Sequence, residues 1–276
     1  MKLSIITINL NNALGLERTS QSVICQTFDD FEWIIIDGAS NDNSCDIIKK
    51  YEKKVTYWIS EPDTGVYNAM NKGIRQAKGD YCLFLNSGDW LYSCDSLSKA
   101  FEKIKNLDRA DVYYSDCILS NNVIQKMAQK LSIDNFYLFE SINHQNSFIK
   151  RSLFFDHEFY NEKNQTTSDV MFFIKEYYLY NSKFIFINTI ISVYTLGGIS
   201  TNYENNRKEL DKEIKDIIGD LEFEKLVDRY TVKKIEKKES LLEKTIKLII
   251  KIIKYIMPYG LYKLYLLIKN IFQEKE

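Results

Sequence analysis

Residues 64–89 of the chain read TGVYNAMNKGIRQAKGDYCLFLNSGD, and they hold the clearest helix and strand patterns of the sequence. Its first half repeats apolar residues every three or four positions, at Val66, Met70, Ile74 and Ala77. This spacing predicts a helix over 64–77, which Asp63 or Thr64 can cap at its first turn. Its second half is an apolar run over 81–85 that ends in a polar turn, which predicts a buried strand.

The same alternation of strand and helix patterns extends back to the N-terminus. Apolar runs over 3–10, 33–37 and 55–59 predict three more strands, and helical spacing over 13–26 and 42–51 predicts helices between them. Strands that alternate with helices indicate an α/β fold with a mostly parallel sheet flanked by helices. The runs are apolar on both sides of the pleat, as expected for strands buried between two helical layers.

The second half of the chain carries a less regular pattern. We expect a helix over 168–180, one or two strands over 183–196, and strands over 111–149 with a hairpin near 120–122. Beyond residue 205 the sequence is charged and helical. The pattern therefore predicts a globular domain over 1–205 and a helical C-terminal region over 206–276.

The composition limits the classes of function. The 276 residues carry a formal net charge of -1, so we expect no nucleic-acid partner, and two histidines are too few for a multi-histidine zinc site. None of the five cysteines forms a CxxC pair, which favours reduced, mostly buried thiols in a cytosolic protein. We find no signal-peptide pattern and no run of about 18 apolar residues, so we expect a cytoplasmic chain without an ordinary membrane span.

Polar clusters follow three of the predicted strands, at 7–11, 37–40 and 86–89. Ligands of open parallel sheets bind outside the carboxyl ends of the strands, so we expect these clusters to face one ligand. No GxGxxG follows the first strand and no Walker-type motif occurs, so the sequence carries neither a dinucleotide fingerprint nor a phosphate-binding P-loop.

Two aspartates in these clusters can carry chemistry. Asp37 can accept hydrogen bonds from a ribose or a base edge, or it can cap the next helix. Asp89 can hold one divalent ion, because Mg²⁺ takes one or two carboxylates and fills its shell with water and phosphate. Such an ion neutralises charge on a departing diphosphate, although a Gly-Asp pair is also common in ordinary turns.

Four segments in a fixed order are specific together, although each is weak alone: SIITIN over 4–9, IDGASND over 36–42, SEPDTGVYNAMNKG over 60–73 and GDYCLFLNSGD over 79–89. They resemble glycosyltransferase family 2, a large family of inverting enzymes with the GT-A fold. The resemblance is greatest to its bacterial branch for capsule, exopolysaccharide and O-antigen synthesis. It is strong over 1–120, the nucleotide-sugar half, and thinner over 121–205, the acceptor half.

The resemblance implies donor-binding roles for nine residues: Thr7, Asn9, Asp37, Ser40, Asp63, Asn68, Lys72, Ser87 and Gly88. It implies that Asp37 contacts the base or ribose, and that Asp89 holds Mg²⁺ or Mn²⁺ at the end of a DxD-type motif. Relatives often read Asp-x-Asp-Asp where this chain reads Asn86-Ser87-Gly88-Asp89. One carboxylate remains, which is enough for a water-rich metal site of weak affinity.

The resemblance also places an acceptor side around His144-Gln145 and Ser168-Asp169. It implies that Asp169 is the general base that removes the acceptor hydroxyl proton, a role worth about 10²- to 10⁴-fold in rate. Without the resemblance, Asp169 is an acidic residue favoured at a helix N-terminus, and His144 is equally a structural hydrogen-bonding residue. Gly197-Gly198 resembles a loop near the donor phosphates, and a simple turn explains it as well.

The C-terminal residues 240–272 have a two-faced pattern. Lys244, Lys247, Lys251 and Lys254 share one helical face, and isoleucine and leucine residues lie between or beyond them. A basic face beside an apolar face is typical of a helix that lies in a membrane interface. Packing on the catalytic domain or on another copy is the alternative. We expect a peripheral location on the inner face of the cell membrane.

These patterns predict an inverting glycosyltransferase that moves a sugar from a nucleoside-diphosphate donor, foremost a UDP-sugar. The expected acceptor is a glycan or lipid-linked glycan in bacterial surface polysaccharide synthesis. One alternative is a sugar-nucleotide binding protein without catalysis, which the thinned motif over 86–89 favours. The other is a membrane-surface scaffold that acts through residues 240–272.

Overall fold

The computed structural model describes residues 2–127, 129–137, 142–164, 166–196 and 203–232, together with residues 245, 246, 248 and 249. The chain forms two compact units, Met1–Phe223 and Glu224–Glu276. Residues 224–232 of the second unit are helical, and the described strands all belong to the first unit. The domain division after residue 205 stays a prediction.

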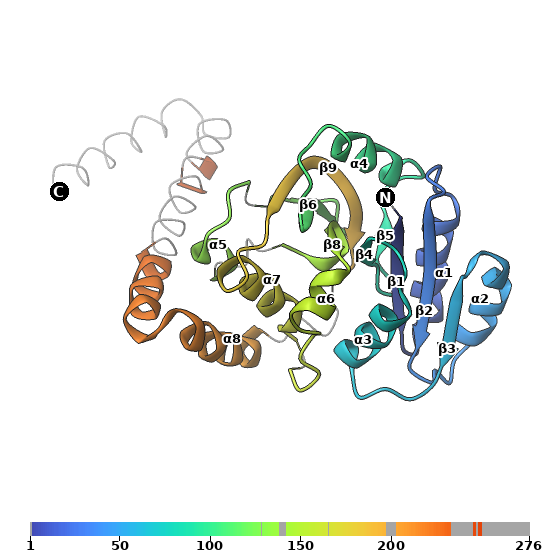
Figure 1. Ribbon diagram of the computed structural model, residues 1–276, viewed down its shortest axis with the longest axis horizontal. Helices are drawn as coiled ribbons and strands as arrows, with labels where there is room; N and C mark the ends of the chain where they lie inside the picture. Colours follow the sequence, from blue (N-terminus) through green and yellow to red (C-terminus); the bar gives the residue numbers. More distant parts are fainter. Residues whose placement is uncertain are drawn as a thin grey trace, which may run out of the picture. The chain divides into compact units, whose positions relative to one another are not determined.

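The N-terminal half alternates strands and helices, as its sequence predicts (Figure 1). Its elements are β1 (Leu3–Asn9), α1 (Ala13–Ile24), β2 (Phe31–Asp37), α2 (Ser44–Tyr51), the 3₁₀ helix η1 (Glu52–Lys54), β3 (Tyr57–Ser60), α3 (Val66–Gln76) and β4 (Tyr81–Phe84). The expected cap of α3 is wrong. Gly65 is its N-cap residue with a φ of 134°, and the Asp63 carboxylate accepts a hydrogen bond from the Gly65 amide instead of capping the helix.

The second half mixes short strands with helices. It consists of β5 (Trp90–Leu91), α4 (Ser96–Ile104), β6 (Val112–Leu119), β7 (Ile124–Gln125), α5 (Ile133–Tyr137), the 3₁₀ helix η2 (His144–Asn146), β8 (Ser147–Lys150), α6 (Ser152–Asp156), α7 (Ser168–Tyr178), β9 (Phe184–Tyr194) and α8 (Tyr203–Ile218). The expected hairpin joins β6 to β7. The expectation of strands over 111–149 is wrong where α5 and η2 form, because helices of five and three residues are too short to show a period.

Among the described residues, nine strands form one mixed sheet in the order β3-β2-β1-β4-β8-β6-β9-β5, with β7 paired to β6. Strands β3, β2, β1 and β4 are parallel to one another. Strand β8 runs antiparallel to both β4 and β6. The parallel register places Asn9 beside Asp37 and brings the polar ends of β1, β2 and β4 to the same edge, so the prediction of an α/β fold with a mostly parallel sheet is confirmed.

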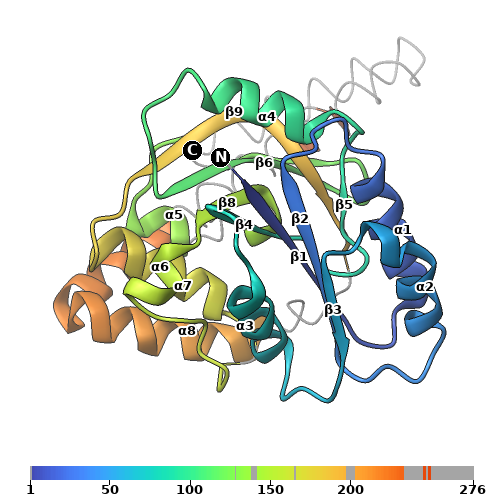
Figure 2. The same ribbon diagram turned by 45° about the vertical axis from the view of Figure 1, so that its right-hand side comes forward.

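Helices cover both faces of the N-terminal strands. Figure 2 shows α1 and α2 on one face of β1, β2 and β3, and α3 on the other. All seven residues of β1 are buried, as the apolar run predicts for a strand between two layers. Helix α3 approaches β1 closely because Gly73 has no side chain, and a Cβ at this position would collide with Ile6.

The cysteine expectation needs a correction. Cys25 and Cys94 form a disulfide, with their Cα atoms 5.1 Å apart, so these two are not reduced thiols. The bond joins the residue after α1 to the loop before α4. A separation of 69 residues hides such a pair from any spacing rule, since only the packing of α1 beside this loop brings the two together. Cys82 and Cys117 are free and buried as expected, and Cys45 is half-buried.

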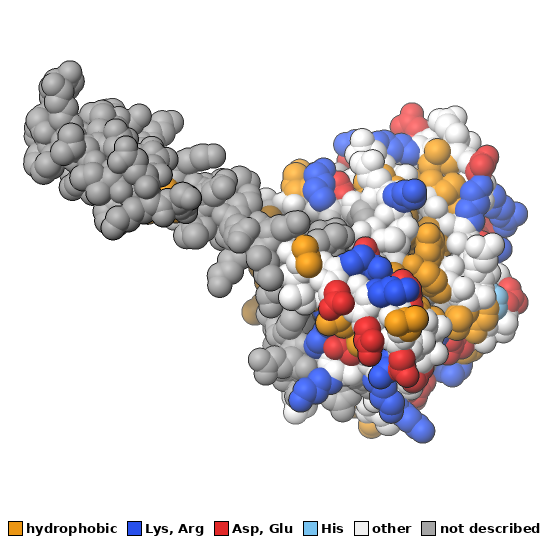
Figure 3. All heavy atoms as spheres, turned by 90° about the vertical axis from the view of Figure 1, so that its left-hand side faces the viewer, with side chains coloured by type: hydrophobic (Ala, Val, Ile, Leu, Met, Phe, Trp, Pro, Cys, Tyr) orange, Lys and Arg blue, Asp and Glu red, His pale blue; other side chains and the backbone are white. Residues whose placement is uncertain are grey.

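Within the described part of the chain, no helix combines the length and the apolar character that a membrane crossing needs. Most of the predicted membrane-binding residues 240–272, and the whole of Gly197-Gly198, lie outside the described residues. Figure 3 shows one face of the molecule on which basic and acidic side chains are interspersed, in keeping with the near-zero net charge.

Candidate active site

A cavity of about 440 Å³ opens at the carboxyl edge of the parallel strands. Its walls come from the ends of β1, β4 and β9, the start of α3, η2 and the start of α7. Seven of the residues predicted for the site line it: Asn9, Asp63, Ser87, Gly88, Asp89, His144 and Asp169. The fold therefore brings the predicted donor side and acceptor side, far apart in sequence, to one cavity.

Asp169 lies in the first turn of α7 and is 9% exposed. Its Oδ2 is 2.7 Å from Nδ1 of His144, and its Oδ1 accepts a hydrogen bond of 2.7 Å from the Tyr67 hydroxyl. Burial alone would raise the pKa of Asp169, but the hydrogen bond and electrostatic interaction with His144, together with hydrogen bonds from the Tyr67 hydroxyl and the Val170 amide, outweigh it and hold the pKa below its ordinary value. A lowered pKa keeps the carboxylate ionised, as a proton acceptor must be.

His144 connects this carboxylate to the end of β4. Its Nε2 is 3.3 Å from Nδ2 of Asn86, and its ring meets Phe84 edge to face. Asn86 also lines the cavity. The polar chain Asn86–His144–Asp169–Tyr67 thus crosses one wall of the cavity, from the first residue of the thinned DxD-type motif to helix α3.

Asp89 lies in the turn after β4 and is 6% exposed. Its Oδ1 accepts a hydrogen bond of 2.8 Å from the backbone amide of Thr195. Thr195 is the residue that directly follows β9. Burial raises the pKa of Asp89 to about 6, against the smaller opposing effects of the Thr195 amide and His144. The groups around Asp89 therefore supply too little positive charge to offset the burial of its ionised carboxylate.

The donor set near Asp89 suits one kind of cation. Among the described residues no cluster of three or more histidine, cysteine or acidic side chains could hold a metal ion. A divalent ion that takes its remaining ligands from water and a diphosphate needs only one or two carboxylates. Asp89 fits such an ion, and it does not fit one enclosed by protein ligands. Gly88, with a φ of 106°, forms the turn that presents this carboxylate.

Asp37 lies behind the cavity wall and is fully buried. Its carboxylate accepts hydrogen bonds from the side chains of Asn9, Ser40 and Ser60, at 2.7, 2.6 and 2.6 Å, and from the Ser40 amide at 2.9 Å. These bonds join the carboxyl ends of β1, β2 and β3. Thr7 is buried in the same layer and accepts a hydrogen bond of 3.0 Å from the Trp33 indole.

Three other predicted site residues do not line the cavity. Asn68 donates to Glu162 at 2.7 Å, and Lys72 binds the Pro62 carbonyl at 2.9 Å and Glu61 at 2.7 Å. Gln145 is 2% exposed beside His144. The substrate-binding roles of these residues, and of Thr7, Asp37 and Ser40, stay predictions.

The sequence analysis missed two residues of the cavity that make its central contacts. Tyr67 binds Asp169, and Thr195 binds Asp89. Tyr67 stands inside the motif over 60–73, but its helical spacing marks it only as a residue of α3. No sequence pattern around Thr195 marks it as a residue of the site, because its place beside Asp89 depends on where β9 ends.

Comparisons with known proteins decide the family. A model of glycosyl transferase family 2 matches residues 4–190, about two thirds of the chain. The chain belongs to glycosyltransferase family 2.

A PGL/p-HBAD biosynthesis glycosyltransferase of Mycobacterium bovis is 32% identical over 154 residues, which cover 55% of this chain and 60% of that protein. An uncharacterized glycosyltransferase of Mycobacterium tuberculosis is 42% identical over 102 residues, covering 37% of this chain and 39% of that one. The family 2 chain therefore spans about 60% or less of the length of these curated relatives.

Solved structures show the same fold at low sequence identity. TarS of S. aureus, residues 1–349 in complex with UDP-GlcNAc, superposes with a TM-score of 0.67 at 19% identity, over 84% of this chain and 72% of that chain. The mannosyltransferase PcManGT of Pyrobaculum calidifontis, in complex with GDP-Man and Mn²⁺, superposes with a TM-score of 0.60 at 13% identity, over 79% and 64%. These likenesses place the family 2 chain among GT-A-like α/β structures.

Proposed function

We propose that this protein is an inverting glycosyltransferase that moves a sugar from a nucleoside-diphosphate donor, a UDP-sugar first of all, to a glycan or lipid-linked glycan. The observation that carries the proposal is the single cavity in which a family 2 sequence brings together Asp89 and Asp169, two buried carboxylates with opposite pKa shifts. Two ionisable groups that their surroundings drive apart are typical of a site that uses them differently.

The donor side of the proposal rests on the polar end of the parallel strands. Asn9, Asp63, Ser87 and Gly88 line the cavity and would contact the nucleoside diphosphate. Of the other residues predicted to bind the donor, Asp37 and Ser40 hydrogen-bond with Asn9 from behind the wall. The donor-binding roles of Thr7, Asn68 and Lys72 stay predictions, because their hydrogen bonds join them to residues that do not line the cavity. Asp89 would hold Mg²⁺ or Mn²⁺, which offsets negative charge on the leaving diphosphate. The Mn²⁺ in the structure of PcManGT supports this choice.

The acceptor side of the proposal assigns the proton transfer to Asp169. The acceptor hydroxyl gives its proton to the Asp169 carboxylate while its oxygen forms a bond to the anomeric carbon of the donor sugar. The bond from this carbon to the diphosphate oxygen breaks, and the nucleoside diphosphate leaves with the electron pair. His144, which is bound to the base, would form the acceptor-side wall, with Gln145 buried beside it.

The substitution Asp169→Asn tests the proposal directly. It keeps the size of the side chain and removes its proton-accepting charge, so release of nucleoside diphosphate should fall by about 10²- to 10⁴-fold. Binding of UDP, measured by calorimetry, should stay unchanged. Equal turnover of wild type and variant would refute the base. Donor binding without turnover by the wild type on any acceptor would favour the alternative, a sugar-nucleotide binding protein without catalysis.

We propose further that the protein acts in surface polysaccharide or glycolipid synthesis at the inner face of the cell membrane, bound through residues 240–272. The basic and apolar pattern of these residues and the relative named for PGL/p-HBAD biosynthesis support this place. The Cys25–Cys94 disulfide opposes it, because disulfides are rare in the cytosol. Flotation with anionic liposomes should fail for a chain that ends before residue 240, and undiminished flotation would remove the role of the tail.

A further inference from the structure

We propose that Tyr67 is a positioning residue that holds the carboxylate of Asp169 in the orientation required for proton transfer. The inference deepens the proposed function and rests on it. Tyr67 has no role in the sequence-based assignment, and the contact that reveals it joins residues 102 positions apart. It is buried at 5% exposure, and it lines the cavity beside the carboxylate it binds.

The first argument is the division of hydrogen bonds at Asp169. The Tyr67 hydroxyl donates to Oδ1, and His144 lies against Oδ2, each at 2.7 Å. One donor on each oxygen fixes the plane of a carboxylate, whereas a single donor lets it rotate about the remaining bond. A carboxylate has about four lone-pair sites, so one stays available to receive the proton of an acceptor hydroxyl even with the Val170 backbone amide as a third donor.

The second argument is the rigidity of the Tyr67 ring. The ring packs against that of Tyr160, with centroids 5.5 Å apart. Tyr160 in turn packs against Phe84, Phe154 and Phe172, at centroid distances of 5.5, 5.3 and 5.4 Å. A ring enclosed in such a cluster cannot change its rotamer without disturbing its neighbours. The hydroxyl of Tyr67 is therefore a fixed point against which Asp169 is aligned.

The third argument is the place of Tyr67 between the two sides of the cavity. It stands in the first turn of α3, next to Gly65 and Val66, which line the cavity near Asp63 on the predicted donor side. Its hydroxyl reaches α7 on the predicted acceptor side. One side chain thus sets the distance between the residues assigned to the donor and the residue assigned to the base.

The chain contains a matched control for Tyr67. Tyr160 is a tyrosine of the same cluster and is 3% exposed, and its hydroxyl has no hydrogen-bond partner in the described part of the chain. In the described part of the chain, the ionisable groups with a leading electrostatic interaction with Asp169 include Tyr67 of α3, His144 of η2 and Tyr160. Removing the hydroxyl of Tyr160 tests the loss of an oxygen atom from the cluster, while removing that of Tyr67 also tests the loss of the bond to Asp169.

The experiment compares wild type, Tyr67→Phe, Tyr160→Phe and Asp169→Asn across a range of pH. Tyr67→Phe should lower kcat about tenfold and leave the KM of the nucleotide-sugar donor within about twofold. It should also move the acidic limb of the pH–rate profile upward by about one pH unit, because the lost hydrogen bond favoured the ionised form. Tyr160→Phe should leave both the rate and the acidic limb unchanged.

A double variant separates an effect through Asp169 from a general loss of structure. In the Asp169→Asn background, the further change Tyr67→Phe should alter the residual rate by less than about twofold. An unshifted acidic limb, or losses that simply multiply in the double variant, would overturn the role of Tyr67. If Asp169→Asn itself turned over like wild type, the base assignment would fail instead. The two failures are therefore distinguishable, and thermal melting of each variant checks that it is folded.

Discussion

Two aspartates in one cavity show that the immediate surroundings of a carboxyl group decide the direction of its pKa shift. Asp169 and Asp89 are nearly equally buried, at 9% and 6% exposure. Asp169 binds both a tyrosine hydroxyl and a histidine, and its pKa is lowered. Asp89 has one backbone amide as partner, and burial raises its pKa to about 6. The first is suited to accept a proton, and the second is suited to bind a cation.

The raised pKa of Asp89 predicts a pH-dependent metal affinity. Below a pKa of about 6 the carboxylate holds a proton, which a cation must displace. The affinity for Mn²⁺ in the presence of UDP should therefore fall by up to about tenfold for each pH unit below this value. Titration followed by the paramagnetic signal of Mn²⁺ measures it, and Asp89→Asn, which cannot ionise, should bind weakly at every pH. Equal affinity of the wild type near pH 5 and pH 7.5 would contradict the assignment.

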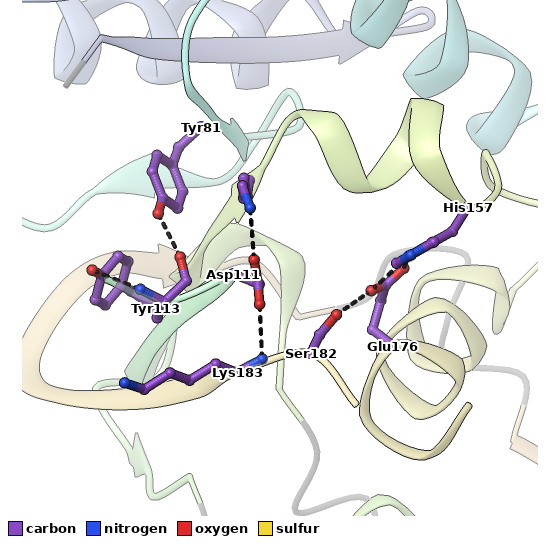
Figure 4. A network of polar contacts seen from close by, with 9 residues as sticks. Tyr81, Asp111, Tyr113, His157, Glu176, Ser182 and Lys183 are labelled. Atoms are coloured by element: carbon purple, nitrogen blue, oxygen red, sulfur yellow. Dashed lines mark hydrogen bonds and ion pairs between the residues drawn. The ribbon is translucent and has the colours of Figure 1, made fainter. Parts of the chain in front are cut away.

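Helix α7 is fixed by hydrogen bonds of its side chains near both ends. Its first turn carries Asp169, and its last turns carry Glu176, which is fully buried. Figure 4 shows Glu176 between His157 and Ser182. Its Oε1 is 2.9 Å from Nδ1 of His157, and its Oε2 accepts a hydrogen bond of 2.6 Å from the Ser182 hydroxyl. Lys183, which follows Ser182, donates its backbone amide hydrogen to the Asp111 carboxylate at 2.9 Å. Lys183 directly precedes β9, and Asp111 directly precedes β6. The sheet thus fixes the far end of the helix whose near end presents the proposed base.

The substitution Glu176→Ala should lower the free energy of unfolding by about 3 kcal/mol, because it leaves His157 and Ser182 without their buried partner. It should also lower kcat, since α7 loses one of its two attachments. Glu158→Ala is the matched control. Glu158 forms an ion pair near the surface with Lys175 of α7, and loss of this pair should cost less than about 1 kcal/mol of stability. Urea unfolding measures both variants, and equal stabilities would show that Glu176 does not anchor the helix.

At the scale of the whole molecule, the order of the strands creates the cavity. Strands β2, β1 and β4 are neighbours, although a helix or a longer segment separates each from the next along the chain. Their polar ends therefore form one edge, and the end of β9 reaches the same place from the second half through Thr195 and Asp89. The Cys25–Cys94 disulfide joins α1 to the loop that follows β5.

The disulfide should stabilise the first unit by restricting the unfolded chain. A closed loop with a sequence separation of 69 predicts a loss of about 4 kcal/mol in the free energy of unfolding for Cys25→Ser, or for the wild type under reductant. Cys45→Ser removes a free thiol and serves as the control. Denaturant unfolding with and without reductant measures the difference. A wild-type stability that reductant leaves unchanged would mean that the bond carries none of it.

Local patterns along the chain were enough to predict the alternation of strands and helices over the first 85 residues and to mark the family motifs within it. The apolar period that marks an element is a local property, and the motifs over 36–42 and 79–89 stand at strand ends, where ligands of such sheets bind. The folded chain was needed to show that Asp37 does not line the cavity while Asp89 does, and that the Tyr67 hydroxyl binds Asp169. The physical reason is that burial, pKa shifts and pairing depend on residues brought together by the topology, and no spacing along the chain encodes them.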